Sequence, residues 1–394
     1  MNPVKITLLT TGQPSTNPRL VKEADALTEA GYEVVVIYCF WAAWAEETDK
    51  ALLASRSWKA IQVGGSPHKN RWLWYYTRLR KKLAKRPEKA ICRAFDELRA
   101  KAIQTPGDLY IAHNLGALPA AALAAQKTGK PFGFDAEDFH REEEDPELPQ
   151  SRLKSLIEKQ YIPKAAYTSA ASPLIAEAYR LLFPEKNWQP ILNVFSLSRQ
   201  SNFRKGGESP IRMIWFSQTV GLNRGIQDVI YAMNELPNLP ITLSLIGTSS
   251  SELQAVFGGI KRNDHHQLEF INPIQEEQLF LLASQHDIGL ALEPGFSPNN
   301  HMALSNKIFT YLLAGNALIA SDTDAQKQFM EQYPGIGKVY PIGNAQALAQ
   351  IIRHYHENRE ALEATRKRAW DLARTELNWE KEQEKFLALV SNVL

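Results

Sequence analysis

Short apolar segments alternate with amphipathic helical segments along almost the whole chain, and this alternation restricts the fold more than any other feature of the sequence. At the amino end, residues 5–9 and 33–38 predict strands, and residues 19–30 predict the helix between them. A strand–helix–strand unit of this kind almost always winds right-handed about a parallel sheet. Strands this apolar, alternating with helices, are typical of doubly wound α/β structure.

The alternation lapses once, between Pro184 and Pro210, and then resumes. Within this gap, residues 201–207 form a polar, glycine-containing stretch that we interpret as a hinge between two domains. The expected fold class is therefore α/β, with two Rossmann-like doubly wound parallel sheets that face each other across a cleft. Ligands of such sheets lie at the carboxyl ends of the strands.

The length of 394 residues is sufficient for each domain to bury its own core. We expect the first domain to comprise residues 1–195 and the second residues 205–375. The last helix, residues 378–394, is expected to pack back on the first domain.

The charge of the chain is nearly balanced overall but not along its length. The formal net charge is +2, yet residues 1–200 contain 28 Lys and Arg against 22 Asp and Glu, whereas residues 201–394 contain 17 against 21. The apolar share of 44% is typical of soluble globular proteins. Cys39 and Cys92 are too few for a disulfide framework. The first residues lack the pattern of a secretion signal, so we expect a cytoplasmic protein.

Polar residues follow three of the strands predicted in the first half. Gly12 lies in the loop before the first helix, where free backbone N–H groups favour an anion, although an ordinary turn would also use this glycine. A lone glycine does not make a dinucleotide fingerprint, so NAD or FAD binding is unsupported. His113, Asp135 and Glu137 end two further strands. A histidine beside carboxylates can orient hydroxyls or move protons, but such residues also cap turns.

Two cations in the second half stand at the beginnings of predicted helices. Arg224 precedes Gly225, and an arginine beside a helix N-terminus suits a phosphate. Lys307 lies in the first turn of a helix that ends at Gly315, after a long polar loop that begins at Glu293. Because the helix dipole repels a cation there, Lys307 is a candidate anion ligand; a solvent-facing lysine is the alternative. No Walker pattern accompanies either cation.

Several segments, taken in order, carry a resemblance to a known enzyme family. In the first half they are Arg19-Leu20, Gly31-Tyr32-Glu33-Val34, Ala112-His113-Asn114 and Asp135-Ala136-Glu137. In the second half they are Arg224-Gly225, residues 305–315 and Asn378-Trp379-Glu380. Together they resemble the bacterial family 4 glycosyltransferases over nearly the whole chain. The resemblance implies a GT-B fold, with the sugar donor bound mainly by the second domain and the acceptor by the first.

The resemblance further implies a metal-independent, retaining transfer of a sugar from a nucleotide-diphosphate sugar to a hydroxyl group. The expected acceptor is a surface polysaccharide or a lipid-linked glycan, and neither a cofactor nor a metal is expected. Preorganised cations would stabilise the charge that develops on the leaving phosphate. The expected catalytic residues are His113, Asp135 and Glu137. The expected donor-binding residues are Gly12, Gln218, Arg224, Gly225, Thr248, Glu293, Asn306, Lys307 and Thr310.

The sequence departs from the family pattern at three places. Many relatives have two glutamates where this chain has Met302 and Thr310, and a Gly-Arg pair where it has Ser217-Gln218. We expect Glu293 to replace the first glutamate from a longer loop. Two other functions stay open: a non-catalytic GT-B-like partner that regulates another transferase, and another GT-B enzyme such as a sugar epimerase.

Residues 68–86 contain eight Lys and Arg and no acid, with tryptophans and tyrosines between them. Cations interleaved with aromatic side chains suit an anionic membrane surface. Nucleic acid would be attracted by the same charge, but no nucleic-acid-binding motif accompanies it. The alternative is a surface helix whose aromatic side chains face the protein's own core. The residues predicted to contact a membrane or acceptor are Arg71, Trp72, Trp74, Arg78, Arg80, Lys81 and Lys82.

Overall fold

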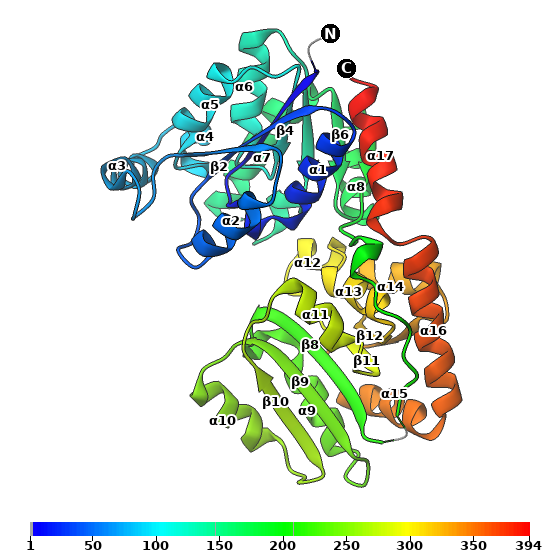
Figure 1. The fold of residues 1–394 in the computed structure, drawn as a ribbon. Helices are drawn as coiled ribbons and strands as arrows, with labels where there is room; N and C mark the ends of the chain where they lie inside the picture. Colours follow the sequence, from blue (N-terminus) through cyan, green and yellow to red (C-terminus); the bar gives the residue numbers. More distant parts are fainter. Residues whose placement is uncertain (1–2, 146, 208) are drawn as a thin grey trace. The chain divides into compact units, whose positions relative to one another are not determined.

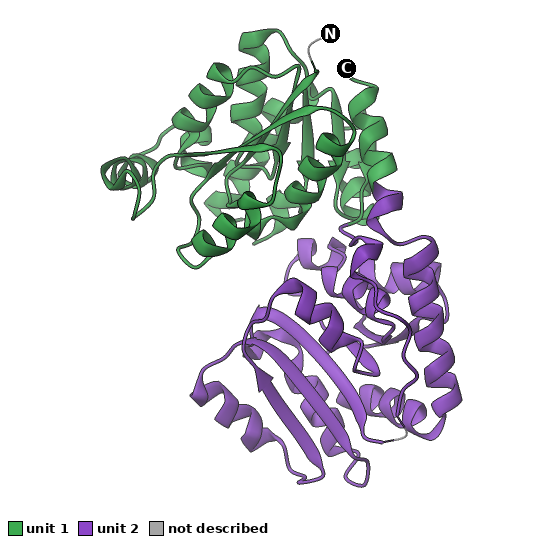
Figure 2. Ribbon diagram, viewed as in Figure 1, with its two compact units in different colours: residues 1–192, 383–394 green, residues 193–382 purple. Residues whose placement is uncertain are grey.

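The computed structural model describes residues 3–145, 147–207 and 209–394, and these divide into two compact units (Figure 2). Unit 1 comprises Met1–Leu192 and Gln383–Leu394, and unit 2 comprises Asn193–Glu382. Each unit is built around a parallel sheet of its own. No helix among the described residues is long and apolar enough to cross a membrane.

The sheet of unit 1 has seven strands in the order β3-β2-β1-β4-β5-β6-β7, and all neighbouring pairs are parallel. The central strands are almost completely buried, which explains why they read as continuous apolar runs. The strand bounds are β1 Lys5–Thr10, β2 Glu33–Cys39, β3 Lys59–Val63, β4 Leu109–His113, β5 Phe132–Ala136, β6 Tyr167–Ala170 and β7 Trp188–Pro190.

Helices lie on both faces of this sheet (Figure 1). The first helix illustrates how the sequence sets its ends: the side chain of Asn17 accepts a hydrogen bond from the Leu20 amide, and Pro18 occupies the first helical position. The helix bounds are α1 Pro18–Glu29, α2 Ala45–Ala54, α3 Arg71–Lys82, α4 Pro87–Ile91, α5 Phe95–Gln104, α6 Leu118–Thr128, α7 Pro149–Tyr161 and α8 Pro173–Leu182.

The sheet of unit 2 has six parallel strands in the order β10-β9-β8-β11-β12-β13. Its core gathers the inner side chains of β8 and β9 against α9, with Trp215 and Phe257 among the fully buried residues. The strand bounds are β8 Ile211–Thr219, β9 Ile241–Thr248, β10 His266–Ile271, β11 Ile288–Ala291, β12 Ala317–Ser321 and β13 Gly337–Tyr340.

The helices of unit 2 include one that ends where the sequence predicts. Gly315 follows α13 with a φ of +74°, and this left-handed conformation favours glycine. The helix bounds are α9 Ile226–Asn234, α10 Ser251–Ile260, α11 Glu276–Ala283, α12 Pro298–Met302, α13 Asn306–Ala314, α14 Asp324–Gln332, α15 Ala345–Glu357 and α16 Arg359–Thr375. The last helix, α17 Trp379–Ser391, begins in unit 2 and belongs to unit 1 from Gln383 onward.

The polar stretch that the sequence presents as a hinge lies along α16 within unit 2. The Trp370 indole donates a hydrogen bond to the Ser201 carbonyl, and Arg366 donates to the Arg204 carbonyl. The ring of Phe203 packs edge-on against Trp370, with 6.0 Å between centroids. The low hydropathy of this stretch is therefore explained by its contacts with α16, which are mainly hydrogen bonds.

Candidate functional site

Both sheets have the same topological switch point, since the strand order reverses between β1 and β4 and again between β8 and β11. In open α/β sheets, ligands bind at the carboxyl ends of the strands beside this reversal. In unit 1 that position holds the loop after β1 and the end of β4. In unit 2 it holds the loops after β8 and β11.

The loop after β1 is fastened to the end of β4 by side-chain hydrogen bonds. Thr11 Oγ1 donates to Asn114 Oδ1 at 2.9 Å, and Asn114 Nδ2 donates to Thr10 Oγ1 at 3.0 Å. Asn114 has a φ of +63°, a left-handed conformation that asparagine tolerates better than most residues do. Gly12 lies in this loop, and a Cβ added to it would meet Thr16 Oγ1 at 3.1 Å. The glycine therefore keeps the loop close-packed.

His113 and Asp135 are register partners at the ends of β4 and β5, and both lie inside a buried cluster of charges. His113 Nε2 is 3.1 Å from Glu23 Oε2, and His113 Nδ1 is 3.5 Å from a carboxylate oxygen of Asp135 and of Glu137. Arg19 binds the Asp135 carboxylate in bidentate fashion, at 2.5 and 2.7 Å. Ser169 Oγ also donates to Asp135, at 2.7 Å.

The charged groups of this cluster shift one another's pKa values. Burial disfavours the charged form of His113, but Glu23, Asp135 and Glu137 outweigh it and raise the His113 pKa well above its ordinary value. Burial would raise the pKa of Asp135, yet Arg19 and His113 hold that pKa well below its usual range. The surrounding carboxylates thus favour the imidazolium form of His113, and the ring is completely buried. An imidazolium held this way orients carboxylates and cannot accept a further proton.

Glu137 is the most accessible of the three carboxylates around His113, with 22% of its side chain exposed against 1% for Asp135 and Glu23. The side-chain amide of Asn17, the residue that caps α1, donates to Glu137. Glu137 therefore joins the buried cluster to the loop after β1 and to solvent.

Among the described residues, two groups bring possible metal-ligand atoms within 4.8 Å of one another. They are Glu23, His113 and Asp135, and a second group of Asp138, His140 and Glu143. In the first group the Arg19 guanidinium already neutralises Asp135. In the second, Lys154 Nζ lies 2.6 Å from Glu143. Each group therefore already contains a protein cation on one of its carboxylates.

In unit 2, Arg224 ends the short turn between β8 and α9 and is exposed. Within the part of the chain that the structure describes, no carboxylate lies at ion-pair distance from it. Gly225 follows with a φ of +73° and caps α9 without any side-chain hydrogen bond. A Cβ at this glycine would meet the Leu292 Cβ at 3.1 Å. Gly225 thus brings the turn against the end of β11 and leaves the first N–H groups of α9 uncapped by a side chain.

Glu293 and Lys307 form an ion pair at the beginning of α13. Lys307 Nζ lies 3.0 Å from Glu293 Oε1, and Ser305 Oγ donates to the same oxygen at 2.8 Å. Burial opposes the charge of Glu293, but Lys307, Ser305 and Asn300 outweigh it and lower the Glu293 pKa. Both side chains keep about one-sixth of their surface exposed, 15% for Glu293 and 16% for Lys307. Glu293 is thus the carboxylate that pairs with Lys307 at the beginning of α13, and its predicted part in donor binding stays a prediction.

The remaining predicted donor residues differ in accessibility. Gln218 and Thr248 are exposed at the carboxyl ends of β8 and β9, and Asn306 is exposed at the start of α13. Thr310 is only 1% exposed, inside α13. Met302 is half-buried at the end of α12. The two positions where the family resemblance leads one to expect glutamates thus hold an apolar side chain and a buried hydroxyl.

Sequence reasoning missed Arg19 and Glu23 as members of the charged cluster. The signal is their spacing: they are four residues apart on α1, on the side that also buries Leu20, Ala26 and Leu27. A charged pair repeated at helical spacing among core residues indicates a buried ionic network. Asn17 and Ser305 were also missed, because a capping residue looks the same in any helix.

The residues predicted to contact a membrane or acceptor all lie on α3. Trp72 is 87% exposed, whereas Trp74 is half-buried. Arg80 turns inward to Asp96 and Glu97, at 3.1 and 2.5 Å. The helix therefore has an inner and an outer face, and the predicted residues divide between them.

No protein-family model matches this chain, and no curated protein matches it in sequence. Solved structures match it in fold. HepE from Anabaena, in complex with UDP-glucose, is 17% identical and has a TM-score of 0.70, covering 98% of this chain and 99% of that one. Sucrose-phosphate synthase from Thermosynechococcus elongatus is 14% identical, with a TM-score of 0.74 over 99% and 98%. An S. aureus TarM variant, in complex with fondaparinux, α-GlcNAc-glycerol and UDP, is 11% identical, with a TM-score of 0.72 over 98% and 99%.

These likenesses extend over the whole length of each chain and include both sheets. The fold is therefore GT-B, with two Rossmann-like α/β domains, as the sequence predicts. At such low identities the likeness concerns the fold, and the function has to be argued from the site.

Proposed function

We propose that this protein transfers a sugar from a nucleoside-diphosphate sugar to a hydroxyl group of an acceptor, with retention of anomeric configuration and without a metal. The observation that carries the proposal is Arg224, an exposed arginine without an ion-pair partner in the described part of the chain, beside the start of α9. An arginine in this place can bind two phosphate oxygens at once, and the helix N-terminus adds a favourable dipole.

The chemistry of the proposed step explains why a cation is needed. When the bond between the anomeric carbon and the diphosphate oxygen breaks, negative charge develops on that oxygen. The acceptor oxygen bonds to the anomeric carbon, and its proton passes to the leaving phosphate. Arg224 stabilises this charge more strongly than the ground state, which lowers the barrier. Lys307 supplies a second cation, oriented by Glu293. In this proposal Glu293 also accepts hydrogen bonds from the sugar, in place of the missing glutamate.

The ligands named for the matched structures support a nucleotide-sugar donor. HepE binds UDP-glucose, and the TarM variant binds UDP. By analogy of fold, UDP is the first nucleotide to test on this chain. Gly12, Gln218, Gly225, Thr248, Asn306 and Thr310 are proposed as the other donor contacts.

In unit 1 we assign the catalytic role to Glu137, as the accessible carboxylate, and a positioning role to His113 and Asp135. His113 Nδ1 lies 3.5 Å from a Glu137 carboxylate oxygen and helps to fix the orientation of that carboxylate. A partly exposed carboxylate can accept hydrogen bonds from sugar or acceptor hydroxyls.

The proposed acceptor is a growing surface polysaccharide or a lipid-linked glycan, and the proposed location is the cytoplasm at the inner face of the membrane. An acceptor anchored in lipid requires the enzyme to reach the membrane surface. The proposal includes no cofactor and no nucleic-acid partner.

A second candidate is a non-catalytic GT-B protein that regulates another transferase. It is favoured by Thr310, because a threonine that is 1% exposed offers no carboxylate to a donor ribose. This candidate predicts nucleotide binding without turnover, or no binding. A sugar epimerase would instead convert the donor without any acceptor.

The test is a panel of nucleoside-diphosphate sugars, with binding followed by calorimetry and products by NMR, with and without EDTA. The proposal expects micromolar binding of one donor, EDTA-resistant turnover and a retained anomeric configuration. Binding without release of nucleoside diphosphate in the presence of glycan acceptors supports the regulator instead. Folded protein that binds no member of the panel contradicts the proposal.

A further inference from the structure

Helix α3 turns its apolar stripe away from the protein. Trp72, Tyr76, Leu79 and Leu83 are 87%, 57%, 57% and 73% exposed. Their spacing of four, three and four residues places them on one side of a helix. Thr77 is the residue that points inward: it is completely buried, and its hydroxyl accepts a hydrogen bond from Arg93 Nη1 at 2.8 Å. The alternative of aromatic side chains facing the protein's own core therefore does not describe this stripe.

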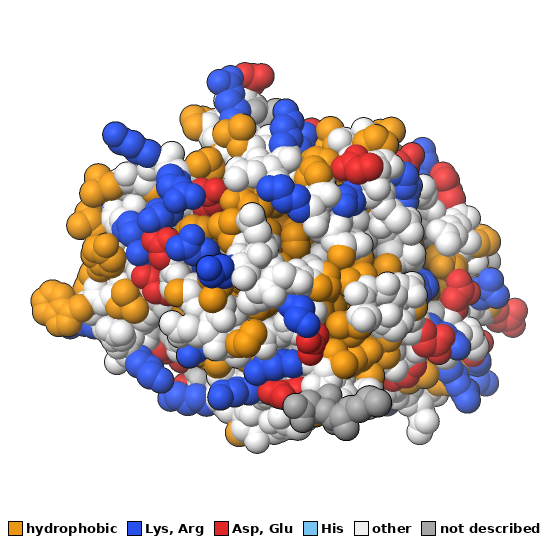
Figure 3. Space-filling model, turned by 90° about the horizontal axis from the view of Figure 1, so that it is seen from above, with side chains coloured by type: hydrophobic (Ala, Val, Ile, Leu, Met, Phe, Trp, Pro, Cys, Tyr) orange, Lys and Arg blue, Asp and Glu red, His pale blue; other side chains and the backbone are white. Residues whose placement is uncertain are grey.

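Most of the cations around this stripe have no ion-pair partner among the described residues. Six of the eight basic residues between residues 68 and 86 form no ion pair with any described residue. They are Lys69, Arg71, Arg78, Lys81, Lys82 and Lys85. Figure 3 shows Lys and Arg side chains interspersed with hydrophobic ones on the side of the molecule where α3 lies. Exposed apolar side chains and unpaired positive charge thus occupy the same surface.

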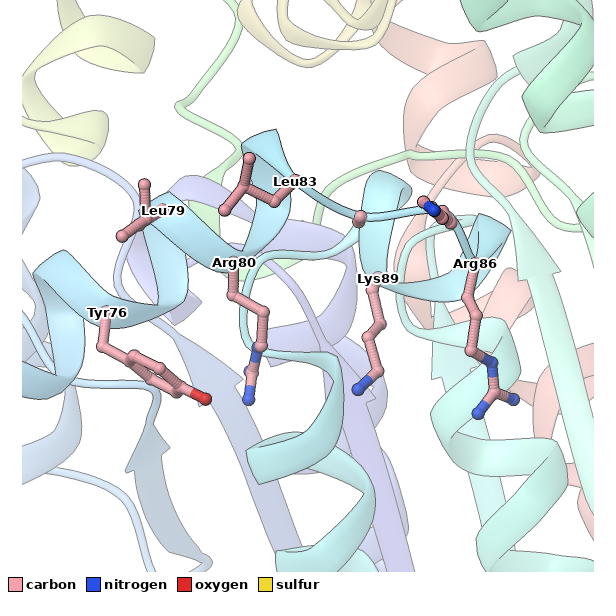
Figure 4. A pocket seen from close by; sticks show the side chains of 8 residues that line it. Tyr76, Leu79, Arg80, Leu83, Arg86 and Lys89 are labelled. Carbon is pink, nitrogen blue, oxygen red and sulfur yellow. The ribbon is translucent and has the colours of Figure 1, made fainter.

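A cavity of about 450 Å³ lies beside the stripe, between α3 and α4 (Figure 4). Tyr76, Leu79 and Leu83 give it apolar walls, and Arg80, Lys85, Arg86 and Lys89 supply cationic groups. In Figure 4, Leu79 and Leu83 project to one side of the ribbon, while Arg80, Lys89 and Arg86 extend to the other. The apolar walls of this cavity can hold hydrocarbon, and of its four cations Lys85 is the one that has no ion pair with a described residue.

The inner cations are neutralised by the protein itself. Arg80 pairs with Asp96 and Glu97, and Lys89 Nζ lies 2.8 Å from Asp96. The ion pairs of Arg80 fix the orientation of α3 on the domain, and that of Lys89 holds α4. The uncompensated charge is therefore on the outer side of the helix, with the exposed stripe.

Two further tryptophans of unit 1 are exposed. Trp41 and Trp44 are 71% and 59% exposed in the segment that leads from β2 to α2. This segment is joined to the base of α3, because Arg93 donates hydrogen bonds to the Phe40 and Gly65 carbonyls. Tryptophans are enriched at the boundary between lipid and water.

We propose that α3, with the cavity between α3 and α4, docks on an anionic phospholipid bilayer: the leucines and Trp72 enter the boundary of the acyl chains, and the outer cations bind lipid phosphates. This proposal adds a docking surface to the membrane location proposed above. It rests on the proposed function only for the reason to dock, which is to reach an acceptor anchored in lipid. Charge complementarity selects the occupant, since the surface has unpaired cations and no acid between residues 68 and 86. Exposed leucines favour lipid over nucleic acid, because they cannot stack on bases.

The experiment is flotation of the full chain with vesicles of phosphatidylcholine, either alone or mixed with phosphatidylglycerol. We expect binding to the mixed vesicles to be at least ~tenfold stronger and to weaken as salt is raised. Trp72→Ala/Leu83→Ser should reduce this binding by roughly tenfold. Lys81→Glu/Lys82→Glu should remove the preference for anionic lipid.

Matched controls carry the same chemical changes on other surfaces. Leu181→Ser alters a leucine that is 80% exposed on α8, and Lys327→Glu/Lys338→Glu reverses two exposed charges of unit 2. Both controls should bind vesicles like the unchanged protein. Nucleotide affinity should be the same in every variant, so a failure of docking is distinguishable from a failure of the proposed transfer.

Three results would overturn the proposal. The first is equal binding to neutral and anionic vesicles, and the second is unchanged binding by the α3 variants. The third is a dimer in sedimentation velocity that Leu79→Ser/Leu83→Ser dissociates, which would assign the stripe to a second copy of the chain. Tighter binding to single-stranded RNA than to anionic vesicles would equally reject a lipid partner.

Discussion

The two switch points of this protein hold charges of the same kinds in opposite settings. In unit 1, Arg19 and His113 are buried and each faces carboxylates. In unit 2, Arg224 is exposed and faces no carboxylate of the described residues. A buried cation with its partners stabilises a particular arrangement of strand ends, because every partner must be present to offset desolvation. An exposed cation without partners stabilises little and is available to a ligand.

Glu293 and Lys307 lie between these extremes. Their ion pair is mostly buried, yet both side chains retain some contact with solvent. The lysine is thus oriented but partly neutralised, so it should contribute less to anion binding than Arg224. Whether a charged residue stabilises the fold or is available to a ligand thus depends more on whether its charge is compensated than on the type of residue.

Among the variants that test this comparison between the two units, Asp135→Asn should have the largest effect. Removing the carboxylate leaves the Arg19 guanidinium buried with Glu23 as a distant partner, 3.7 Å away. We expect unit 1 to lose about 3–5 kcal/mol of unfolding free energy. Equilibrium unfolding in urea, followed by tryptophan fluorescence, measures it.

The control is Asp108→Asn, which breaks an ion pair with Lys130 whose side chains are 42% and 45% exposed. That change should cost no more than about 1 kcal/mol. Equal losses of unfolding free energy in the two variants would show that the buried cluster stabilises the fold no more than an exposed ion pair does.

The second effect concerns ligand affinity. Arg224→Ala should weaken nucleoside-diphosphate binding by about 2–3 kcal/mol, because it removes charge-assisted hydrogen bonds. Lys307→Met should weaken it by only about 1 kcal/mol, since Glu293 already compensates the lysine. Calorimetry with UDP compares the two, and Arg262→Ala, an exposed arginine of the same unit, is the control. A larger loss for Lys307→Met would reverse the ranking of the two cations.

The third effect is a pH dependence of opposite sign in the two regions. The folded-state pKa of His113 is raised, so its stabilisation is complete below about pH 6.5 and is lost as the pH rises through the folded value. The pKa of Glu293 is lowered, so its stabilisation is present above about pH 4.3 and is lost as the pH falls through the folded value.

The corresponding variants separate these contributions. His113→Gln should flatten the alkaline loss of unfolding free energy, and Glu293→Gln should flatten part of the acid loss. Urea unfolding across a pH series measures both. If His113→Gln leaves the alkaline slope as it is, the imidazolium is not the group that titrates there.

Much of the fold could be predicted from the sequence, and the reason is burial. Strands such as β4 and β12 are completely buried and read as apolar runs, whereas β3 and β10 at the sheet edges are half exposed and carry no such pattern. The site was harder to predict. Strand ends place His113 beside Asp135, but only packing shows that Arg19 reaches the same carboxylate from a helix more than a hundred residues away.

The smallest expected effect sharpens the comparison most, because it changes one charge and little else. Glu293→Gln can keep hydrogen bonds to Ser305 and Asn300 but releases Lys307 from its counter-charge. The affinity for UDP should then rise by roughly threefold, which corresponds to less than about 1 kcal/mol. The affinity for a UDP-sugar should rise less or fall, since the proposed contact of Glu293 with the sugar is weakened. A lower affinity for UDP itself would mean that Glu293 aids diphosphate binding by holding Lys307 in place. The orientation of Lys307 would then matter more for binding than the partial neutralisation of its charge by Glu293.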